Sequence, residues 1–322
     1  MRGLSGGSPL KTMAKSYGTT AFLLAFACLQ LPALTASTPL PFSGPADATP
    51  LAEPKNREAS GLAASRRTPG LLWVHSDSGG EPVLYGVDAT TGERRATLRL
   101  KGCTNTDWED IASFEKDSKA WLVVGDIGDN YARRPAILLH VLEEPDPVTL
   151  RPDAETEIAP AYTLRVVYED LARDCESLAV DPREGFIYLI SKRNAVPRLY
   201  RLPLAPNKEL VVARHVGMVP HVPQPDFFQR LLKTPTGRYR AEPCAMDFAP
   251  DGSAAVVLTY GDTLFFPRAA HESWAEALAK NPIILGAHNL PQAEAVCFSA
   301  DGRAIFVTSE ESPRLLRYDR TR

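Results

Sequence analysis

Five glutamates recur along the chain, each close to the start of a short apolar run. They are Glu58, Glu109, Glu176, Glu242 and Glu294, and successive members are 51, 67, 66 and 52 residues apart. The surrounding phrases are alike, for example DWEDIA (107–112), DCESLAV (174–180) and AEAVCF (293–298). Carboxylate oxygens suit calcium, which accepts about six to eight oxygen ligands in flexible geometry. These glutamates are therefore candidate metal ligands, with calcium as the candidate ion, provided that the fold brings them together.

Each phrase is followed by further short runs rich in β-forming residues. The third repeat continues as FIYLISK, RLYRLPL and ELVVARHVGMV, with the turn DPREG after its first run. Repeats of about 50 residues built from four such runs are typical of propeller blades. We therefore predict an all-β fold over residues 51–322, a single β-propeller of five four-stranded blades, with six blades as the alternative. The outer strand missing from the last repeat is expected just before Glu58, and the helical sequence 271–281 is expected to lie as a decoration between strands.

The first strand of a propeller blade lies innermost, so equivalent positions at its start form a ring around the central channel. Carboxylates that face one another in such a ring raise each other's pKa or require a cation. Two interpretations remain open at this point. The ring binds calcium, or each carboxylate accepts backbone N–H groups of the next blade and ties the blades together.

A second set of polar residues follows the second strand of each repeat, where an antiparallel strand returns to the same mouth of the channel. Examples are HSDSGG (75–80), GDIGDN (125–130) and SKRN (191–194). The candidate catalytic residues are His75, Asp77, Asp126, Lys192 and Arg193. The candidate ligand-binding residues on this face are Trp108, Asp110, Arg133, Arg134, Lys192, Arg193 and Glu310. The turns at the other ends of the inner strands, such as PDGS and ADGR, are ordinary tight-turn sequences.

The 322-residue chain has a net charge of −3, and this lack of basic excess argues against a nucleic-acid partner. Residues 1–36 combine early basic residues with an apolar run that ends in small residues, which is typical of a secretory signal cut after Ala36. A lipid anchor at Cys28 is the alternative. Residues 37–50 are expected to form a flexible leader. No later run is long enough for a transmembrane span, so the protein is expected to be secreted or periplasmic.

Four cysteines remain beyond the predicted signal. Cys103 and Cys175 each precede an inner strand of neighbouring repeats, where a disulfide is compatible with export and two free thiols are the alternative. Cys244 and Cys297 lie inside inner strands and are expected to be small buried residues.

Several of these phrases together resemble a group of exported bacterial propeller proteins of unassigned activity. The matching phrases are SGLAAS with WVHSDSG, NTDWEDIA with VVGDIGDN, DCESLAVDP with LISKR, and AEAVCF with TSEE. More distantly, the sequence is similar to phytase-like esterase domains and to calcium-dependent lactonase propellers. The lactonase resemblance implies a channel calcium held by a glutamate that opens an inner strand, which points to Glu58, Glu109, Glu176 and Glu294. The asparagine, aspartate and histidine that complete the lactonase site have no identified counterparts in this sequence.

Two hypotheses for the function follow. The first is an exported, monomeric, calcium-binding module whose charged face holds a small molecule, a glycan or a protein. The second is a metal-dependent hydrolase of a phosphoester, an ester or a lactone at the channel mouth, where the metal polarises the scissile group. The basic residues of the face favour an anionic substrate under the second hypothesis. The lack of a recognisable nucleophile favours the first.

Overall fold

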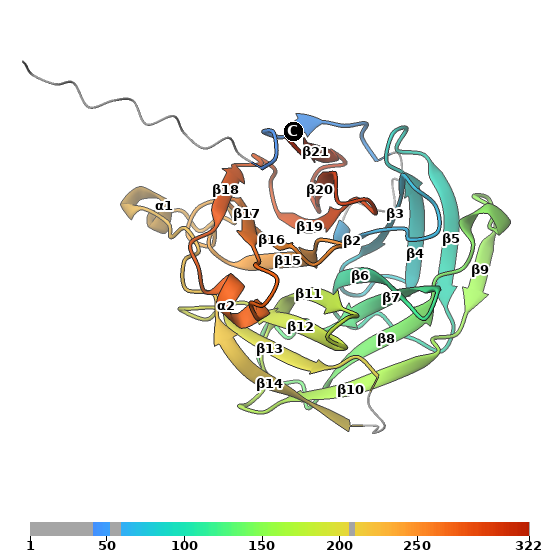
Figure 1. Ribbon diagram of the computed structural model, residues 1–322, viewed down its shortest axis with the longest axis horizontal. Helices are drawn as coiled ribbons and strands as arrows, with labels where there is room; N and C mark the ends of the chain where they lie inside the picture. The colour runs from blue at the N-terminus through green and yellow to red at the C-terminus, as the bar shows by residue number, and fades with distance from the viewer. Residues whose placement is uncertain (1–40, 52–58, 206–209, 322) are drawn as a thin grey trace, which may run out of the picture. The chain divides into compact units, whose positions relative to one another are not determined.

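Strands account for almost all the regular structure in the described residues, 41–51, 59–205 and 210–321, of this computed structural model (Figure 1). The prediction of an all-β fold is confirmed. Three short helical segments interrupt the strands: η1 (Pro147–Thr149), α1 (Phe227–Leu231) and α2 (Trp274–Leu278). No helix in the described residues is both long and apolar enough to span a membrane.

The described strands belong to four hydrogen-bonded sheets rather than five. The first sheet has the order β2 (Ala59–Ala64), β3 (Leu71–Ser76), β4 (Val83–Asp88), β5 (Arg94–Leu100) and β9 (Glu155–Ile158). The second begins β6 (Trp108–Lys116), β7 (Lys119–Asp126), β8 (Ile137–Glu143) and β10 (Tyr162–Tyr168), and continues β14 (Leu210–Met218), β13 (Arg198–Pro203), β12 (Phe186–Ser191) and β11 (Cys175–Asp181). This sheet has eight strands because the outer strands β10 and β14 pair in parallel. Each of its halves is the four-stranded antiparallel meander expected of a blade.

The two remaining sheets have four strands each. One has the order β15 (Pro243–Phe248), β16 (Ala254–Thr259), β17 (Thr263–Pro267) and β18 (Ile283–Gly286), and the other has the order β19 (Ala293–Phe298), β20 (Ala304–Ser309), β21 (Leu316–Asp319) and β1 (Ala46–Asp47). The strand that completes the last repeat is therefore β1, which is antiparallel to β21 and lies further from Glu58 than expected. Phe42 is also buried against this sheet, so the described part of the predicted flexible leader is packed.

The innermost strands β2, β6, β11, β15 and β19 lie next to one another in that order, and β19 lies next to β2 (Figure 1). All residues of β2, β11, β15 and β19 are buried. Small residues are frequent there, as in ASGLAA and AEAVCF, because these strands crowd together. Sheets arranged around such a group of inner strands form a β-propeller.

The helical turn predicted within 271–281 is present as α2, which lies between strands and buries Trp274, Ala277 and Leu278. Trp274 is fully buried, and its ring stacks on Phe248 with 3.6 Å between centroids. Its indole Nε1 donates to Asp181 Oδ2 at 2.9 Å. Helix α2 therefore fills a space between neighbouring sheets.

Of the two alternatives for Cys103 and Cys175, the structure has free thiols and not a disulfide. All four cysteines in the described residues are free, and Cys103 is half-buried whereas Cys175 is fully buried. The Cys103 thiol lies 3.5 Å from His140 Nδ1. Cys244 and Cys297 are buried inside β15 and β19, as expected.

Candidate metal centre

A β-bulge occurs at the second residue of every inner strand. The register of pairing with the neighbouring strand shifts there in all five cases. The bulged residues are Ser60, Glu109, Glu176, Cys244 and Glu294. A bulge changes the direction of the side chain that it carries. The five equivalent positions at this mouth of the channel therefore hold three glutamates, one serine and one cysteine.

The other two predicted glutamates do not occupy these positions. Glu242 precedes the bulged Cys244 by two residues, and its carboxylate is partly exposed and lies 3.9 Å from the Arg193 guanidinium. Glu58 lies outside the described residues and precedes Ser60 by two positions in the sequence. The structure thus brings together three members of the predicted ring.

Glu109, Glu176 and Glu294 form a buried carboxylate cluster. One oxygen from each lies within 4.8 Å of the others, and each residue is at most 5% exposed. Burial raises the pKa of Glu109 well above its usual value, and the Glu176 carboxylate raises it further. Burial also raises the pKa of Glu176, although Lys192 opposes the shift. We call this group the inner cluster.

Lys192 places an ammonium group inside the inner cluster. It follows β12 directly, and its backbone N–H donates to the Asp174 carbonyl at 2.8 Å. Its Nζ donates to Glu176 Oε2 and, at 2.8 Å, to the Tyr260 hydroxyl. Burial, the largest single effect, lowers the pKa of Lys192, but the Glu176 carboxylate together with Cys244, Tyr260 and Glu294 raises it overall. If all groups are ionised, the three carboxylates and this ammonium leave two net negative charges.

Tyr260 and Ser60 complete the hydrogen bonds of the inner cluster. The Tyr260 hydroxyl donates to Glu294 Oε1 at 2.6 Å, and Ser60 Oγ donates to Glu109 Oε2 at 3.2 Å. Neither residue was predicted as part of the site. Ser60 could have been found by aligning the repeats on their apolar residues, whereas Tyr260 lies in a loop where spacing gives no signal.

A second group of carboxylates shares Glu109 and lies nearer to solvent. Asp77, Asp107 and Glu109 each place an oxygen within 4.8 Å of the other two, and the two aspartates are only partly buried. Burial and then the Asp77 charge raise the pKa of Asp107 to about 6. We call this group the outer cluster. Asp107 was not predicted, although it opens the quoted phrase DWEDIA.

Gly128 lets the GDIGDN loop approach the outer cluster. A Cβ atom at this position would overlap a carboxylate oxygen of Glu109 and another of Asp107. The adjacent Asp126 is fully buried, accepts the Asp107 backbone N–H at 3.2 Å and pairs with Arg134 at 2.7 Å. Asp126 and Arg134 therefore hold the loop in place, and of the two only Asp126 is fully enclosed.

Glu310, which follows β20, adds a fourth buried carboxyl beside Glu294. Its Oε2 accepts a hydrogen bond from Gln292 at 2.5 Å. Burial, followed by the Glu294 charge, raises the pKa of Glu310 to about 10. Burial and the neighbouring charge thus both favour the protonated form of Glu310.

Asp110 links neighbouring inner strands by accepting their backbone N–H groups, which is the structural role that was considered for the glutamates. Its Oδ1 accepts the N–H of Ile111 at 2.9 Å, and its Oδ2 accepts those of Leu178 at 2.8 Å and Met246 at 3.1 Å. These bonds link β6, β11 and β15 through one fully buried carboxyl group. Asp110 is therefore a structural residue and not the ligand-binding residue that the sequence suggested.

His75 and Trp108 also belong to the packed interior. Both are fully buried, and their rings meet edge to face with 5.6 Å between centroids. Burial lowers the pKa of His75 to about 4, although a hydrogen bond to the Ser76 carbonyl opposes the shift. A general base must reach a substrate proton, which this buried imidazole does not. Trp108 Nε1 donates to the Thr104 carbonyl at 3.1 Å, so its polar atom is also used internally.

Arg193 and Arg133 are more exposed than the other predicted basic residues. Arg193 donates to Asp174 Oδ2 at 2.5 Å and also to Asn130 Oδ1. It lines a cavity of about 370 Å³ together with residues that include Arg238 and Glu242. A cavity on this face is therefore bordered by guanidinium groups that an anionic ligand could contact.

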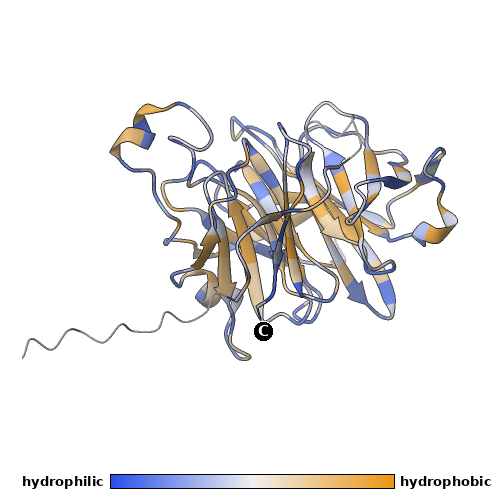
Figure 2. Ribbon diagram, turned by 90° about the horizontal axis from the view of Figure 1, so that it is seen from above, coloured by the Kyte–Doolittle hydropathy of each residue, from blue (hydrophilic) through white to orange (hydrophobic). Residues whose placement is uncertain are grey.

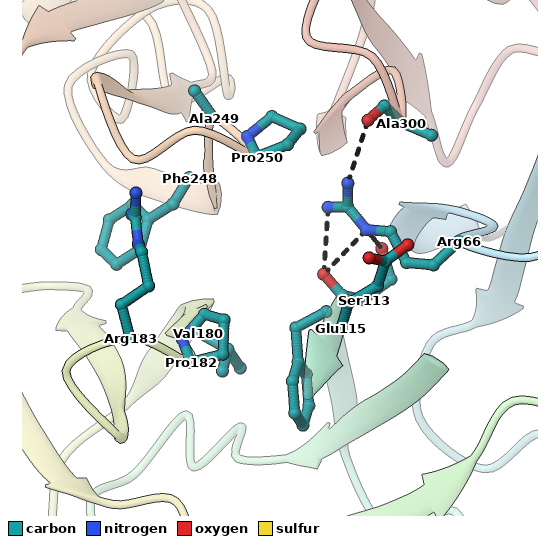
Figure 3. A pocket seen from close by; sticks show the side chains of 11 residues that line it. Arg66, Ser113, Glu115, Val180, Pro182, Arg183, Phe248, Ala249, Pro250 and Ala300 are labelled. Carbon is teal, nitrogen blue, oxygen red and sulfur yellow. Dashed lines mark hydrogen bonds between the residues drawn. The ribbon is translucent and has the colours of Figure 1, made fainter. Parts of the chain in front are cut away.

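The opposite ends of the inner strands enclose a different cavity, of about 270 Å³ (Figure 3). Arg66 lies at its edge, where its Nη2 donates to the Ser113 carbonyl at 3.0 Å and its Nε to Ser113 Oγ at 3.0 Å. Arg183 lies on the other side and pairs with Asp181 at 3.3 Å. The two arginines that border this cavity are thus bonded to acceptors of the fold.

Comparisons with known proteins find propellers at low identity. No family model matches the chain, and no curated protein matches it. A gluconolactonase from Xanthomonas campestris is similar over 88% of this chain and 99% of its own, with 12% identity and a TM-score of 0.44. The Dos1 propeller is similar over 81% of this chain and 68% of its own, with 13% identity and a TM-score of 0.39. The chain is distantly similar to lactonase-type propellers, and identities this low do not transfer an activity.

Proposed function

We propose that this chain is a five-bladed β-propeller that binds a divalent cation, with calcium as the ion, at the inner and outer clusters. The observation that supports the proposal is the spacing of Glu109, Glu176 and Glu294, whose oxygens lie within 4.8 Å of one another. Two oxygens that ligate one calcium ion at about 2.4 Å are at most about twice that distance apart. The donor set therefore fits the ion. Five blades follow if each inner strand, including those at the two ends of the eight-stranded sheet, begins one blade.

The charge of the inner cluster supports the same proposal. Three buried carboxylates oppose one ammonium, and such an excess of charge is costly unless it is protonated or neutralised. A divalent ion would neutralise the two remaining charges without displacing Lys192 from Glu176. Glu109 would be the central ligand, because it belongs to both clusters.

We further propose that the bound ion serves a binding module that is exported and acts as a monomer. The cavity beside Arg193 would receive an anionic small molecule, glycan or protein group on the same face. We favour a binding module over an enzyme because the other candidate site residues are enclosed in the fold. They are His75, Asp110, Asp126 and Trp108, and all four are buried. Among the predicted residues, this face thus offers carboxylates that could bind a metal ion and arginine side chains that could contact an anion. It offers no accessible histidine that could act as a base.

The openness of the outer cluster favours a second candidate function. Asp77 and Asp107 are partly exposed, so an ion held there could share its coordination with a substrate oxygen. Catalytic metal sites keep such an open position. A hydrolase of phosphoesters, esters or lactones is the corresponding activity.

Calorimetric titration with calcium tests the proposal. We expect Glu109→Gln to weaken calcium binding by about 10- to 100-fold, because it removes a charge from both clusters. Glu242→Gln is the matched control, since Glu242 lies at the start of an inner strand but outside the clusters, and it should change the affinity less than about twofold. Equal effects of the two substitutions, or no binding by the unmodified chain, would contradict the proposal. Hydrolysis of any phosphoester, ester or lactone that is lost in Glu109→Gln but retained in Glu242→Gln would favour the second function.

A further inference from the structure

The segment between β14 and β15 presents four large apolar side chains to solvent. Phe227 and Phe228 are 71% and 75% exposed, and Leu231 and Leu232 are 65% and 57% exposed. Figure 2 shows helix α1, in its hydrophobic colour, standing away from the sheets at the upper left. Exposed apolar groups that gather in this way usually mark a site of interaction. We call residues 226–233 the apolar tip.

The apolar tip is held in one conformation by its own hydrogen bonds. The Asp226 side chain caps α1 by accepting the Gln229 backbone N–H at 2.8 Å, and the Gln229 side chain accepts the Asp226 backbone N–H at 2.9 Å. The Arg230 side chain donates to the Pro225 carbonyl at 2.9 Å. Val219 and Val222, at the base of the segment, are buried. The segment is therefore anchored in the core and built to expose its end.

Basic residues surround the apolar tip. The whole segment between β14 and β15, residues 219–242, contains four basic residues, Arg230, Lys233, Arg238 and Arg240, and two acidic ones, Asp226 and Glu242. Arg240 is paired with Asp262 at 2.7 Å, which leaves three cations around the tip. The segment is thus positive, whereas the whole chain has a net charge of −3. Its charge is complementary to an anionic surface.

A second exposed aromatic residue with a basic neighbour lies on the same face. Tyr131, in the loop after β7, is 78% exposed, and the Arg133 guanidinium lies 5.5 Å from its ring centroid. Strand β7 ends where β6 begins, so this loop lies at the same mouth of the channel as the segment that leads into β15. Arg193 connects the two regions, since it donates to Asn130 and lines the cavity with Arg238.

We propose that the apolar tip inserts into the headgroup region of an anionic lipid bilayer, with Tyr131 and Arg133 as a second contact. Aromatic and leucine side chains partition into this region, and nearby lysine and arginine side chains bind acidic headgroups. A protruding end suits a deformable lipid surface, because a protein partner would need a matching hollow. Docking would direct the face that carries the outer cluster toward the bilayer.

Tryptophan fluorescence at position 228 tests the proposal locally. Trp73, Trp108 and Trp274 are fully buried, and Trp121 is partly exposed near the start of β7, at the opposite end of the strands. A tryptophan in Phe228→Trp would therefore supply the one exposed tryptophan signal in the described part of this face. We expect its emission to shift to the blue, and to be quenched by brominated lipid, in vesicles of phosphatidylglycerol and phosphatidylcholine. Val148→Trp is the matched control, because Val148 is 83% exposed but follows β8 at the opposite ends of the strands. Its emission should not change.

A second experiment on the full-length chain tests whether the apolar side chains of the tip are needed for vesicle binding. Adding Phe227→Ser and Leu231→Ser to Phe228→Trp should weaken vesicle binding by at least about tenfold. Vesicles of phosphatidylcholine alone should bind the unmodified tip about tenfold more weakly than anionic vesicles. Equal binding to both kinds of vesicle would overturn the assignment to an anionic surface. An unchanged spectrum of Phe228→Trp in the presence of vesicles, or an equal response of Val148→Trp, would overturn the proposal. A blue shift of Phe228→Trp that appears without vesicles when the protein concentration is raised would also overturn it, and would identify contact between two copies of the chain.

Discussion

The two ends of the ring of inner strands differ in how their charges are matched. At one end, Glu109, Glu176 and Glu294 crowd together with a single ammonium from Lys192. At the other, Arg66 meets the carbonyl and hydroxyl of Ser113. At the arginine end the N–H donors of Arg66 are satisfied by acceptors of the fold, whereas the glutamate end crowds carboxylates against a single ammonium. An excess of this kind costs stability unless an ion or protons offset it, so the difference indicates which end is built to bind.

Both ends nevertheless use the same device to hold the strands together. Asp110 near the glutamate end and Asp247 near the arginine end are buried aspartates that accept backbone N–H groups across neighbouring inner strands. Asp247 Oδ2 accepts the Phe298 N–H at 2.9 Å and so links β15 to β19. The candidate metal ligand Glu109 and the structural carboxylate Asp110 are therefore neighbours in the sequence.

Asp110→Ala should give the largest effect. The substitution leaves the N–H groups of Leu178 and Met246 without their acceptor inside the core, and we expect the free energy of unfolding to fall by about 3–5 kcal/mol. Chemical denaturation measures this loss. Asp247→Ala removes the link to one further strand instead of two and should cost less. A loss below about 1 kcal/mol for Asp110→Ala would contradict the tying role.

Lys192→Met should destabilise the glutamate end selectively. Without calcium, we expect a loss of about 2–4 kcal/mol at pH 8, because Glu176 loses the ammonium that compensates its buried charge. The loss should shrink at pH 5, where Glu176 takes up a proton. Calcium should restore more stability to this variant than to the unmodified chain. Denaturation curves at both pH values, with and without calcium, measure these effects. An equal loss at both pH values would contradict the electrostatic role of Lys192.

The pH dependence of stability should also report the excess charge. Burial raises the pKa values of Glu109, Glu176 and Glu310, the last to about 10, so the folded chain holds protons that the unfolded chain releases above about pH 4.5. Stability then falls as pH rises, by about 2 kcal/mol between pH 6 and 8 without calcium. Calcium binding should tighten over the same range, since the ion displaces these protons. Denaturation across this range with a chelator present is the measurement. Stability that rises with pH would contradict the crowding of unpaired carboxylates.

Arg66→Met should give the smallest effect. The side chain loses hydrogen bonds to Ser113, which we expect to cost about 1–2 kcal/mol in denaturation experiments. Arg183→Met is the control, because the Arg183 side chain is 50% exposed and its pairing with Asp181 should contribute less than about 0.5 kcal/mol. Neither change should alter the response to calcium. An altered calcium response in Arg66→Met would show that the two ends are coupled.

The repeats in the sequence predicted the strands because apolar runs, turns and glutamates recurred together. They also predicted the approach of Glu109, Glu176 and Glu294. The prediction assigned Glu58 and Glu242 to the ring because it aligned the repeats on glutamate. Aligned on apolar residues, the phrases ASGLAA and PCAMDF place Ser60 and Cys244 at the bulge, a backbone feature that sets side-chain direction.

Other parts of the site could not be predicted from spacing. Lys192 was predicted on this face from its place after a second strand. Its pairing with Glu176, and the approach of Tyr260 to Glu294, depend on how neighbouring sheets pack. The burial of His75 depends on its contact with Trp108, which lies in another sheet. Polar residue type thus indicated the face but did not separate exposed from enclosed side chains.

The melting temperature of the chain with excess calcium and with a chelator tests the central claim most directly. Binding to the folded state alone raises stability by mass action, so we predict a rise of several degrees with calcium. Glu242→Gln should show the same rise, and Glu109→Gln should show little or none. A melting temperature that is the same with calcium and with chelator would contradict the account and would leave the glutamate end as a cluster neutralised by Lys192 and protons.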